Sequence, residues 1–165
     1  RNNHGTWYDA QVVPIALFLG RDDQTSQVLR EALKKRLASQ IEPDGRQPLE
    51  LARTNAWSYS VFNLEAFFRL AAFGEHIGLD MWDYRTDDGR SIRKALDWLA
   101  PFATGVRKWP YRQIGTFKKE DAFILLRQAA IKYRSREYGQ LAEEVAPSYS
   151  KNGRINLLFP TVTTR

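Results

Sequence analysis

The sequence predicts an all-α fold, an incomplete α/α toroid (α/α barrel) in which inner and outer helices run antiparallel. Two observations predict this fold. Helical segments that are apolar on all sides alternate with amphipathic segments, as buried inner helices alternate with the outer helices that cover them. A polar and aromatic cluster also opens each of the two most apolar segments, and the N-terminal ends of inner helices meet at one mouth of a toroid. A plain helical bundle also satisfies the first observation and is the alternative.

The first inner helix and the first outer helix occupy the N-terminal quarter of the chain. Residues 6–19 are mostly apolar and end at Gly20, and we expect a kink at Pro14. An amphipathic helix then begins at Asp22 or Asp23, whose side chains are suited to capping a helix. Its apolar stripe consists of Val28, Leu29, Ala32, Leu33, Leu37 and Ile41.

A second inner helix and a second outer helix follow a turn at residues 43–45. Residues 56–77 form a long and largely apolar helix that Gly78 ends. The next helix is amphipathic, and we expect Pro101 to stop it. Its apolar positions are Ile92, Ala95, Leu96 and Leu99.

The last third of the chain contains two further predicted helices. They cover residues 120–133 and 138–145. Residues 155–159 are the one segment whose pattern suits a β-strand.

Composition limits the classes of site that the chain can hold. The 165 residues suffice for one domain, and the absence of cysteine excludes disulfides, thiol nucleophiles and cysteine-based zinc sites. Only two histidines are present, which argues against a histidine-rich metal centre. No apolar run has the length of a membrane span. The formal net charge of +6 favours an acidic partner, and the scattered basic residues argue against nucleic acid as that partner.

Three segments bring polar and aromatic residues together. Residues 2–11 begin with two amides and an imidazole, followed by an aromatic pair and a carboxylate, and residues 53–60 contain an arginine, an amide and two aromatic rings. Neutral donors gathered at one point suit the recognition of an anion. Residues 107–113 form a basic and aromatic loop that is suited to lining a groove for a polyuronate.

The first two clusters resemble the signature blocks of alginate lyase-like polysaccharide lyases. The blocks are Asn2-Asn3-His4-Gly5-Thr6-Trp7-Tyr8-Asp9 and Arg53 with Trp57-Ser58-Tyr59-Ser60-Val61-Phe62-Asn63-Leu64. The resemblance covers about residues 1–80 and is closest to polysaccharide lyase families thirty-eight and seventeen. Family five is less similar, because its catalytic tyrosine aligns with Phe62.

This resemblance implies an enzyme that cleaves alginate or a related polyuronate by β-elimination, without a metal or another cofactor, in the periplasm or outside the cell. It implies that residues 1–165 are the C-terminal part of a single toroid lyase domain. The implied catalytic residues are Asn3, His4, Arg53 and Tyr59. The expected substrate-binding residues are Asn2, Trp7, Tyr8, Trp57 and Tyr111. A non-catalytic helical protein that binds acidic glycans is the alternative.

The proposed elimination explains why these residue types are needed. Removal of the C5 proton of a uronate requires its carboxylate to be neutralised, and an amide, an imidazole N–H and a guanidinium are suitable donors. Tyr59 is the candidate base, acid or both. If the proton and the leaving oxygen lie on opposite faces, His4 is the base and Tyr59 the acid, and the sequence does not choose between these routes.

Several of these residues also have structural explanations. Asn2 or Asn3 is suited to capping a helix, and Arg53 is suited to a surface ion pair with Glu50. Tyr59 and the neighbouring aromatic residues are equally suited to a hydrophobic core.

Overall fold

A computed structural model describes residues 2–160 of the chain, and these residues are helical apart from loops and one isolated antiparallel β-bridge between Asn55 and Gln113. The α-helices are α1 (Asn3–Phe18), α2 (Asp22–Glu31), α3 (Ala38–Gln40), α4 (Pro48–Leu51), α5 (Ala56–Gly74), α6 (Ile92–Ala103), α7 (Phe123–Lys132), α8 (Arg136–Val145) and α9 (Pro147–Asn152). The shorter helical segments are the π-helical η1 (Ala32–Leu37) and the 3₁₀-helical η2 (Glu75–Ile77), η3 (Lys119–Ala122) and η4 (Arg154–Leu157).

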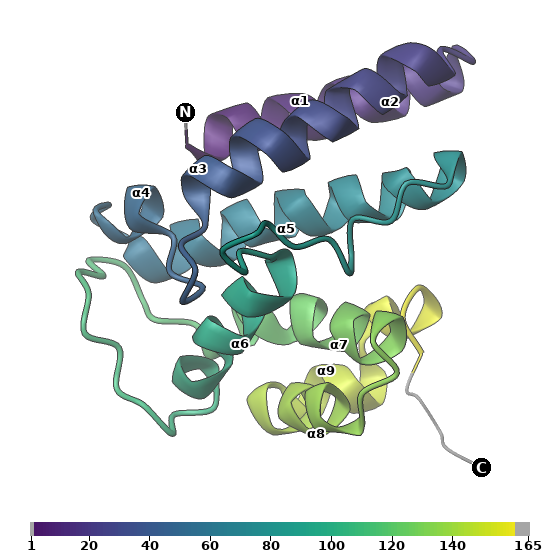
Figure 1. Cartoon of the computed structure of the whole chain (residues 1–165). Coiled ribbons are helices and arrows are strands. Elements are labelled where there is room, and N and C mark those ends of the chain that lie inside the picture. Colours follow the sequence, from purple (N-terminus) through teal and green to yellow (C-terminus); the bar gives the residue numbers. More distant parts are fainter. Residues whose placement is uncertain (1, 161–165) are drawn as a thin grey trace.

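Helices α1 and α5 lie side by side and run in the same direction, while α2 returns antiparallel to them (Figure 1). The indole Nε1 of Trp7 donates a hydrogen bond to the carbonyl of Phe62 at 3.1 Å, and the two rings stack with centroids 4.6 Å apart. Because the two helices are parallel, their N-terminal ends lie on the same side of the molecule. The polar clusters of the sequence are thereby brought to one end, as the prediction of two inner helices requires.

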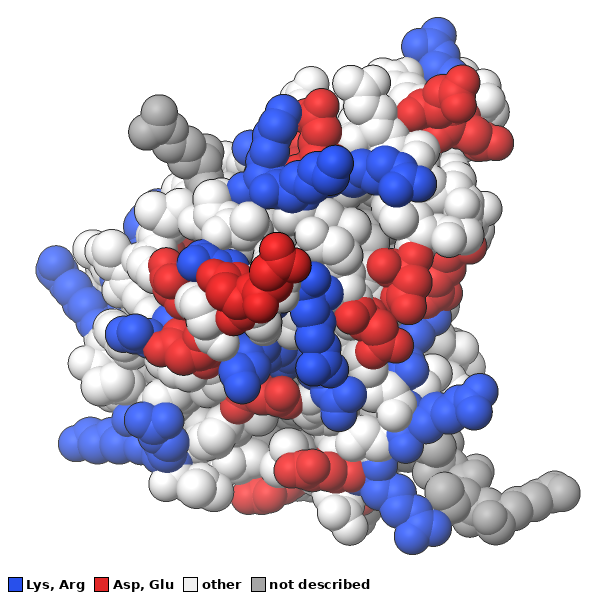
Figure 2. Space-filling model, in the orientation of Figure 1, with Lys and Arg blue, Asp and Glu red and all other residues white. Residues whose placement is uncertain are grey.

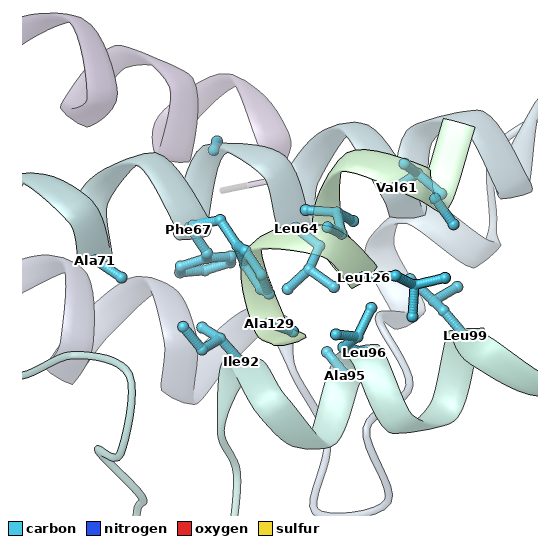
Figure 3. Packing of buried hydrophobic residues seen from close by; sticks show 14 of the residues in the cluster. Val61, Leu64, Phe67, Ala71, Ile92, Ala95, Leu96, Leu99, Leu126 and Ala129 are labelled. Atoms are coloured by element: carbon cyan, nitrogen blue, oxygen red, sulfur yellow. The ribbon is translucent and has the colours of Figure 1, made fainter. Parts of the chain in front are cut away.

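The core lies on both sides of α5. Figure 3 shows side chains of α5, α6 and α7 packed against one another, while α1 covers another side of α5. A helix with neighbours on several sides buries residues all around its axis, which is why the sequence of α5 is apolar rather than amphipathic. The labelled core residues are Val61, Leu64, Phe67, Ala71, Ile92, Ala95, Leu96, Leu99, Leu126 and Ala129.

Two predictions from the sequence are corrected by the structure. Pro101 does not stop α6, which continues to Ala103 because Phe102 and Ala103 are buried in the core and compensate for the backbone hydrogen bond that proline lacks. The helix ends instead before Gly105, which has a positive φ of 79°. Residues 155–159 do not form a strand, since η4 occupies most of this segment.

The predicted toroid is not shown by the described residues. They form a stack of helix pairs that does not close into a ring (Figure 1). The all-helical prediction is confirmed for this part of the chain, and its antiparallel α1 and α2 are consistent with both a toroid and a bundle. Among residues 2–160, no helix is both long enough and apolar enough to cross a membrane.

Candidate active site at the N-terminal ends of α1 and α5

Asn3 begins α1 and is held by a carboxylate from α4. Its backbone N–H donates to Oε1 of Glu50 at 2.8 Å, and its side-chain Nδ2 donates to Oε2 of the same residue at 2.7 Å. Both residues are only 1% exposed. The buried carboxylate therefore satisfies a free N–H group at the helix N-terminus and fixes which way the Asn3 amide faces.

Asn2 and His4 stand on either side of this anchor. Asn2 is the N-cap of α1, and its side-chain oxygen accepts the backbone N–H of His4 at 3.3 Å. The structure thus shows Asn2 in its structural role as a helix cap, which was the alternative to its predicted role in substrate binding. The side chain of His4 is exposed, and its ring has no hydrogen-bond partner within residues 2–160.

Arg53 and Tyr59 form the second half of the site. The guanidinium carbon of Arg53 lies 4.1 Å from the centre of the Tyr59 ring, and both side chains are half-buried. In the described part of the chain, Arg53 has no ion-pair partner and the Tyr59 hydroxyl has no hydrogen-bond partner. The alternative pair of Arg53 with Glu50 is not formed, because that carboxylate is bound to Asn3.

The open guanidinium of Arg53 contrasts with those of Arg36 and Arg90, which are also partly buried. Arg36 is held by Asp9 through two hydrogen bonds, at 2.8 and 3.3 Å. Arg90 binds Asp88 at 2.8 Å and also donates to two backbone carbonyls. A guanidinium that is positioned by an aromatic ring but lacks an anion is suited to receive the carboxylate of a ligand.

The aromatic candidates have different surroundings. Trp57 is 0% exposed, its ring packs against Trp109 and Phe117, and its Nε1 donates to the carbonyl of Lys118 at 2.8 Å. We therefore assign Trp57 to the core, since no part of its ring is open to a sugar. Trp7 is partly buried by its stacking on Phe62.

Tyr8 and Tyr111 are more accessible than Trp57. Tyr8 is 65% exposed and lines a hollow of about 390 Å³ between α1 and the α2–η1 segment. It does not contact Arg53 or Tyr59 through any interaction in the described residues. Tyr111 is half-buried and packs against Trp109, with ring centroids 5.2 Å apart.

The loop that carries Tyr111 is attached to the start of α5. Gln113 accepts the backbone N–H of Trp57 through Oε1 and donates through Nε2 to Oγ of Ser58, both at 3.1 Å. The side-chain oxygen of Asn55 accepts the N–H of Gly115 at 2.8 Å. These bonds hold residues 112–115 directly beside the segment that joins Arg53 to Tyr59.

Two features of the site were missed by reasoning from the sequence. The sequence suggests Glu50 only as an ion-pair partner of Arg53, and no sequence pattern indicates that Glu50 meets Asn3. Asp9 is engaged by Arg36, which packs over Gly5 so closely that a Cβ there would lie 2.7 Å from Nη1. The hydrogen bond to Asp9 raises the pKa of Arg36 above its usual value.

Within residues 2–160, no group of three His, Cys, Asp or Glu side chains is placed to hold a metal ion. The polar side chains at this end of the molecule are an exposed imidazole, a buried amide, and a guanidinium and a phenol that have no ion-pair or hydrogen-bond partner among the described residues.

Comparisons with known proteins identify relatives of the chain. The sequence profile of the family described as alginate lyase matches residues 1–109. The crystal structure of an alginate lyase from Bacteroides ovatus is similar in structure, with a TM-score of 0.89 and 38% sequence identity. The match covers 96% of this chain and 42% of that one, so the chain spans less than half the length of its structural relative. No curated protein matches the chain significantly.

Proposed function

Because the chain belongs to the alginate lyase family, we propose that it cleaves alginate or a related polyuronate by β-elimination and leaves an unsaturated uronate at the new non-reducing end. The observation that carries the proposal is the Arg53 guanidinium over the Tyr59 ring, at the same end of the fold as the start of α1. Among residues 2–160, this guanidinium has no ion-pair partner and the Tyr59 hydroxyl has no hydrogen-bond partner. Arg36 and Arg90, two other partly buried arginines, each have an anionic partner, whereas Arg53 has none in the described part of the chain.

The proposed role of Arg53, His4 and Asn3 is to neutralise the uronate carboxylate. The planar fork of Arg53 matches a carboxylate, and the ring of His4 supplies an N–H. Glu50 takes one N–H of the Asn3 amide, and the second N–H is available only to a substrate group that reaches this buried position. Donors fixed in advance around the carboxylate stabilise the negative charge that spreads onto it when C5 loses its proton.

Tyr59 is the proposed proton carrier. The C5–H bond breaks as its proton moves to the base, a C4–C5 double bond forms, and the C4–O bond breaks as the leaving oxygen takes a proton from the acid. If both events occur on one face of the sugar, Tyr59 performs both. If they occur on opposite faces, His4 is the base and Tyr59 the acid.

Three finer points are proposals that follow from the family rather than from the described residues. We infer that the chain is the C-terminal part of a toroid domain whose other helices complete the groove. Assignment to polysaccharide lyase family thirty-eight or seventeen remains a prediction. So does location in the periplasm or outside the cell.

The test is incubation of the protein with polymannuronate, polyguluronate and polyglucuronate, following the far-ultraviolet absorbance of the unsaturated product. Tyr59→Phe is compared with Tyr149→Phe, because Tyr149 is an exposed tyrosine near the other end of the chain. Loss of product in the first variant alone supports the proposal. Product that survives Tyr59→Phe moves the proton transfer to another residue. If the wild type binds the polymers without forming product, the protein is the non-catalytic glycan binder.

A further inference from the structure

The loop before α7 concentrates positive charge that the fold does not neutralise. Residues 104–118 contain four basic residues and no acidic one, namely Arg107, Lys108, Arg112 and Lys118. Figure 2 shows Lys and Arg side chains along the left edge of the molecule, where Figure 1 places this loop. Within the part of the chain that the structure describes, Arg107 and Lys108 form no ion pair. Their charges are therefore available to an anion from outside.

A hollow of about 500 Å³ lies in this loop and combines these charges with aromatic rings. Arg107 and Lys108 line it together with Trp109, Tyr111 and Gln113. Trp109 is held in place by the edge of the Trp57 ring, with centroids 5.4 Å apart. The buried Nε1 of Trp109 also has no hydrogen-bond partner among the described residues.

This combination suits an acidic sugar. Rigid rings offer a flat apolar surface for the C–H face of a pyranose, and the two cations are suited to a carboxylate. Each ring is already ordered by its neighbours, so binding to it does not require a side chain to become fixed.

The hollow adjoins the candidate active site. Gln113 lines it and is also hydrogen-bonded to the backbone of Trp57 and to Ser58, in the first turns of α5. The bridge between Gln113 and Asn55 places the loop beside the residues that join Arg53 to Tyr59. A polymer that passes the active site on this side therefore meets the loop.

A cavity on another side of α5 has the opposite character. Its volume is about 540 Å³, and it is lined by residues that include Glu65, Glu120 and Asp121. Three carboxyl groups disfavour a polyanion, and Arg154 is the single basic residue among the lining residues. We therefore expect a polyuronate to leave the active site over the basic hollow of the loop, and not over this acidic cavity.

We propose that the hollow lined by Arg107, Lys108, Trp109 and Tyr111 is a second hexuronate-binding site, which holds a sugar of the polymer beyond the one that reacts. This inference rests on the proposed function for the identity of the polymer. It adds that specificity for an acidic sugar extends beyond the active site into the loop between α6 and α7.

The test measures binding of a mannuronate pentamer by calorimetry, with the double variant Arg107→Gln/Lys108→Gln. The matched control is Arg30→Gln/Lys34→Gln, which removes the same charge from exposed positions on α2 and η1. Tyr59→Phe is the background for all proteins, so that the oligomer is not cleaved. Circular dichroism checks that each variant is folded.

We expect the loop variant to bind about tenfold more weakly and the control to bind like its parent, because only the loop pair, of the two substituted pairs, contacts the oligomer. Equal affinities in the parent and the loop variant overturn the proposal. Equal losses in both double variants also overturn it, since they show an effect of net charge alone. Failure of the proposed lyase activity is recognised separately, by the absence of unsaturated product from the wild type, and the binding measurement is still valid in that case.

Discussion

Replacement of Glu50 by alanine is expected to destabilise the chain strongly, although the substitution removes a charged residue. The carboxylate accepts two hydrogen bonds from Asn3, at 2.8 and 2.7 Å, and lies in a buried position. Alanine leaves the backbone N–H and the side-chain amide of Asn3 without their acceptor. Water has little access to this position, since both residues are 1% exposed.

The magnitude follows from these two bonds. A hydrogen bond to a charged group contributes about 1.5–3 kcal/mol, so we expect the free energy of unfolding to fall by about 3 kcal/mol or more. For a domain of this size, roughly 2–4 °C of Tm is lost per kcal/mol, which corresponds to a decrease of about 6–12 °C. Glu50→Gln keeps one acceptor oxygen and turns an NH₂ group toward an Asn3 donor, so its effect is expected to be intermediate.

The assay is thermal and urea unfolding followed by circular dichroism. Glu31→Ala is the control, because this glutamate forms an exposed ion pair with Lys35 at 3.1 Å, and its loss is expected to cost only about 0.3–0.5 kcal/mol. A Tm of Glu50→Ala within about 1 °C of the control refutes the reasoning. That result means that the Asn3–Glu50 bonds are replaced by water without cost.

Three further predictions concern packing, pH and catalysis. Gly5→Ala is expected to lower the free energy of unfolding by about 1–2 kcal/mol, because the new Cβ would lie 2.7 Å from Nη1 of Arg36. The Arg36 side chain would then have to leave its ion pair with Asp9. An unchanged midpoint of urea unfolding contradicts this prediction. Burial and the hydrogen bond to Asp97 raise the pKa of Tyr138, so stability is expected to be constant up to a pH of about 10 and to fall above it, as the unfolded chain loses the proton first. Urea unfolding at increasing pH measures this, and the fall is expected to be shallower in Tyr138→Phe. Arg53→Lys keeps the charge but loses the planar fork, so kcat/KM for the polyuronate is expected to fall about tenfold or more, and an unchanged value removes Arg53 from the site.

The helices were predictable from the sequence because their signals are local. The residues that open α1, the apolar stripe of α2 and the positive-φ Gly78 after α5 act within one or two turns of the chain. The prediction that α6 stops at Pro101 was wrong because it used a local signal alone. The signal of this proline to stop the helix is weaker than the burial of Phe102 and Ala103, which depends on distant parts of the chain.

The candidate site divides in the same way. The residue types for an anion site were visible in the sequence at positions 2–4 and 53–59, since the chemistry resides in the side chains. The partners of those residues were not visible, because Asn3 and Glu50 are 47 positions apart and meet only when α1 packs beside α4 and α5.

Trp57 and Tyr59 illustrate what only the tertiary structure decided. Both belong to one motif, and the sequence assigned both to the site. Residues that are two positions apart on an α-helix, as Trp57 and Tyr59 are, point in directions about 200° apart. The rotation of α5 about its axis therefore decides which of the two rings faces the core. That rotation is set by packing between α5 and its neighbours, which buries Trp57 against Trp109 and leaves Tyr59 half-exposed under Arg53. Composition and local pattern thus determined the helices and the chemistry that they carry, while the packing of one helix on another determined which of those side chains a ligand can reach.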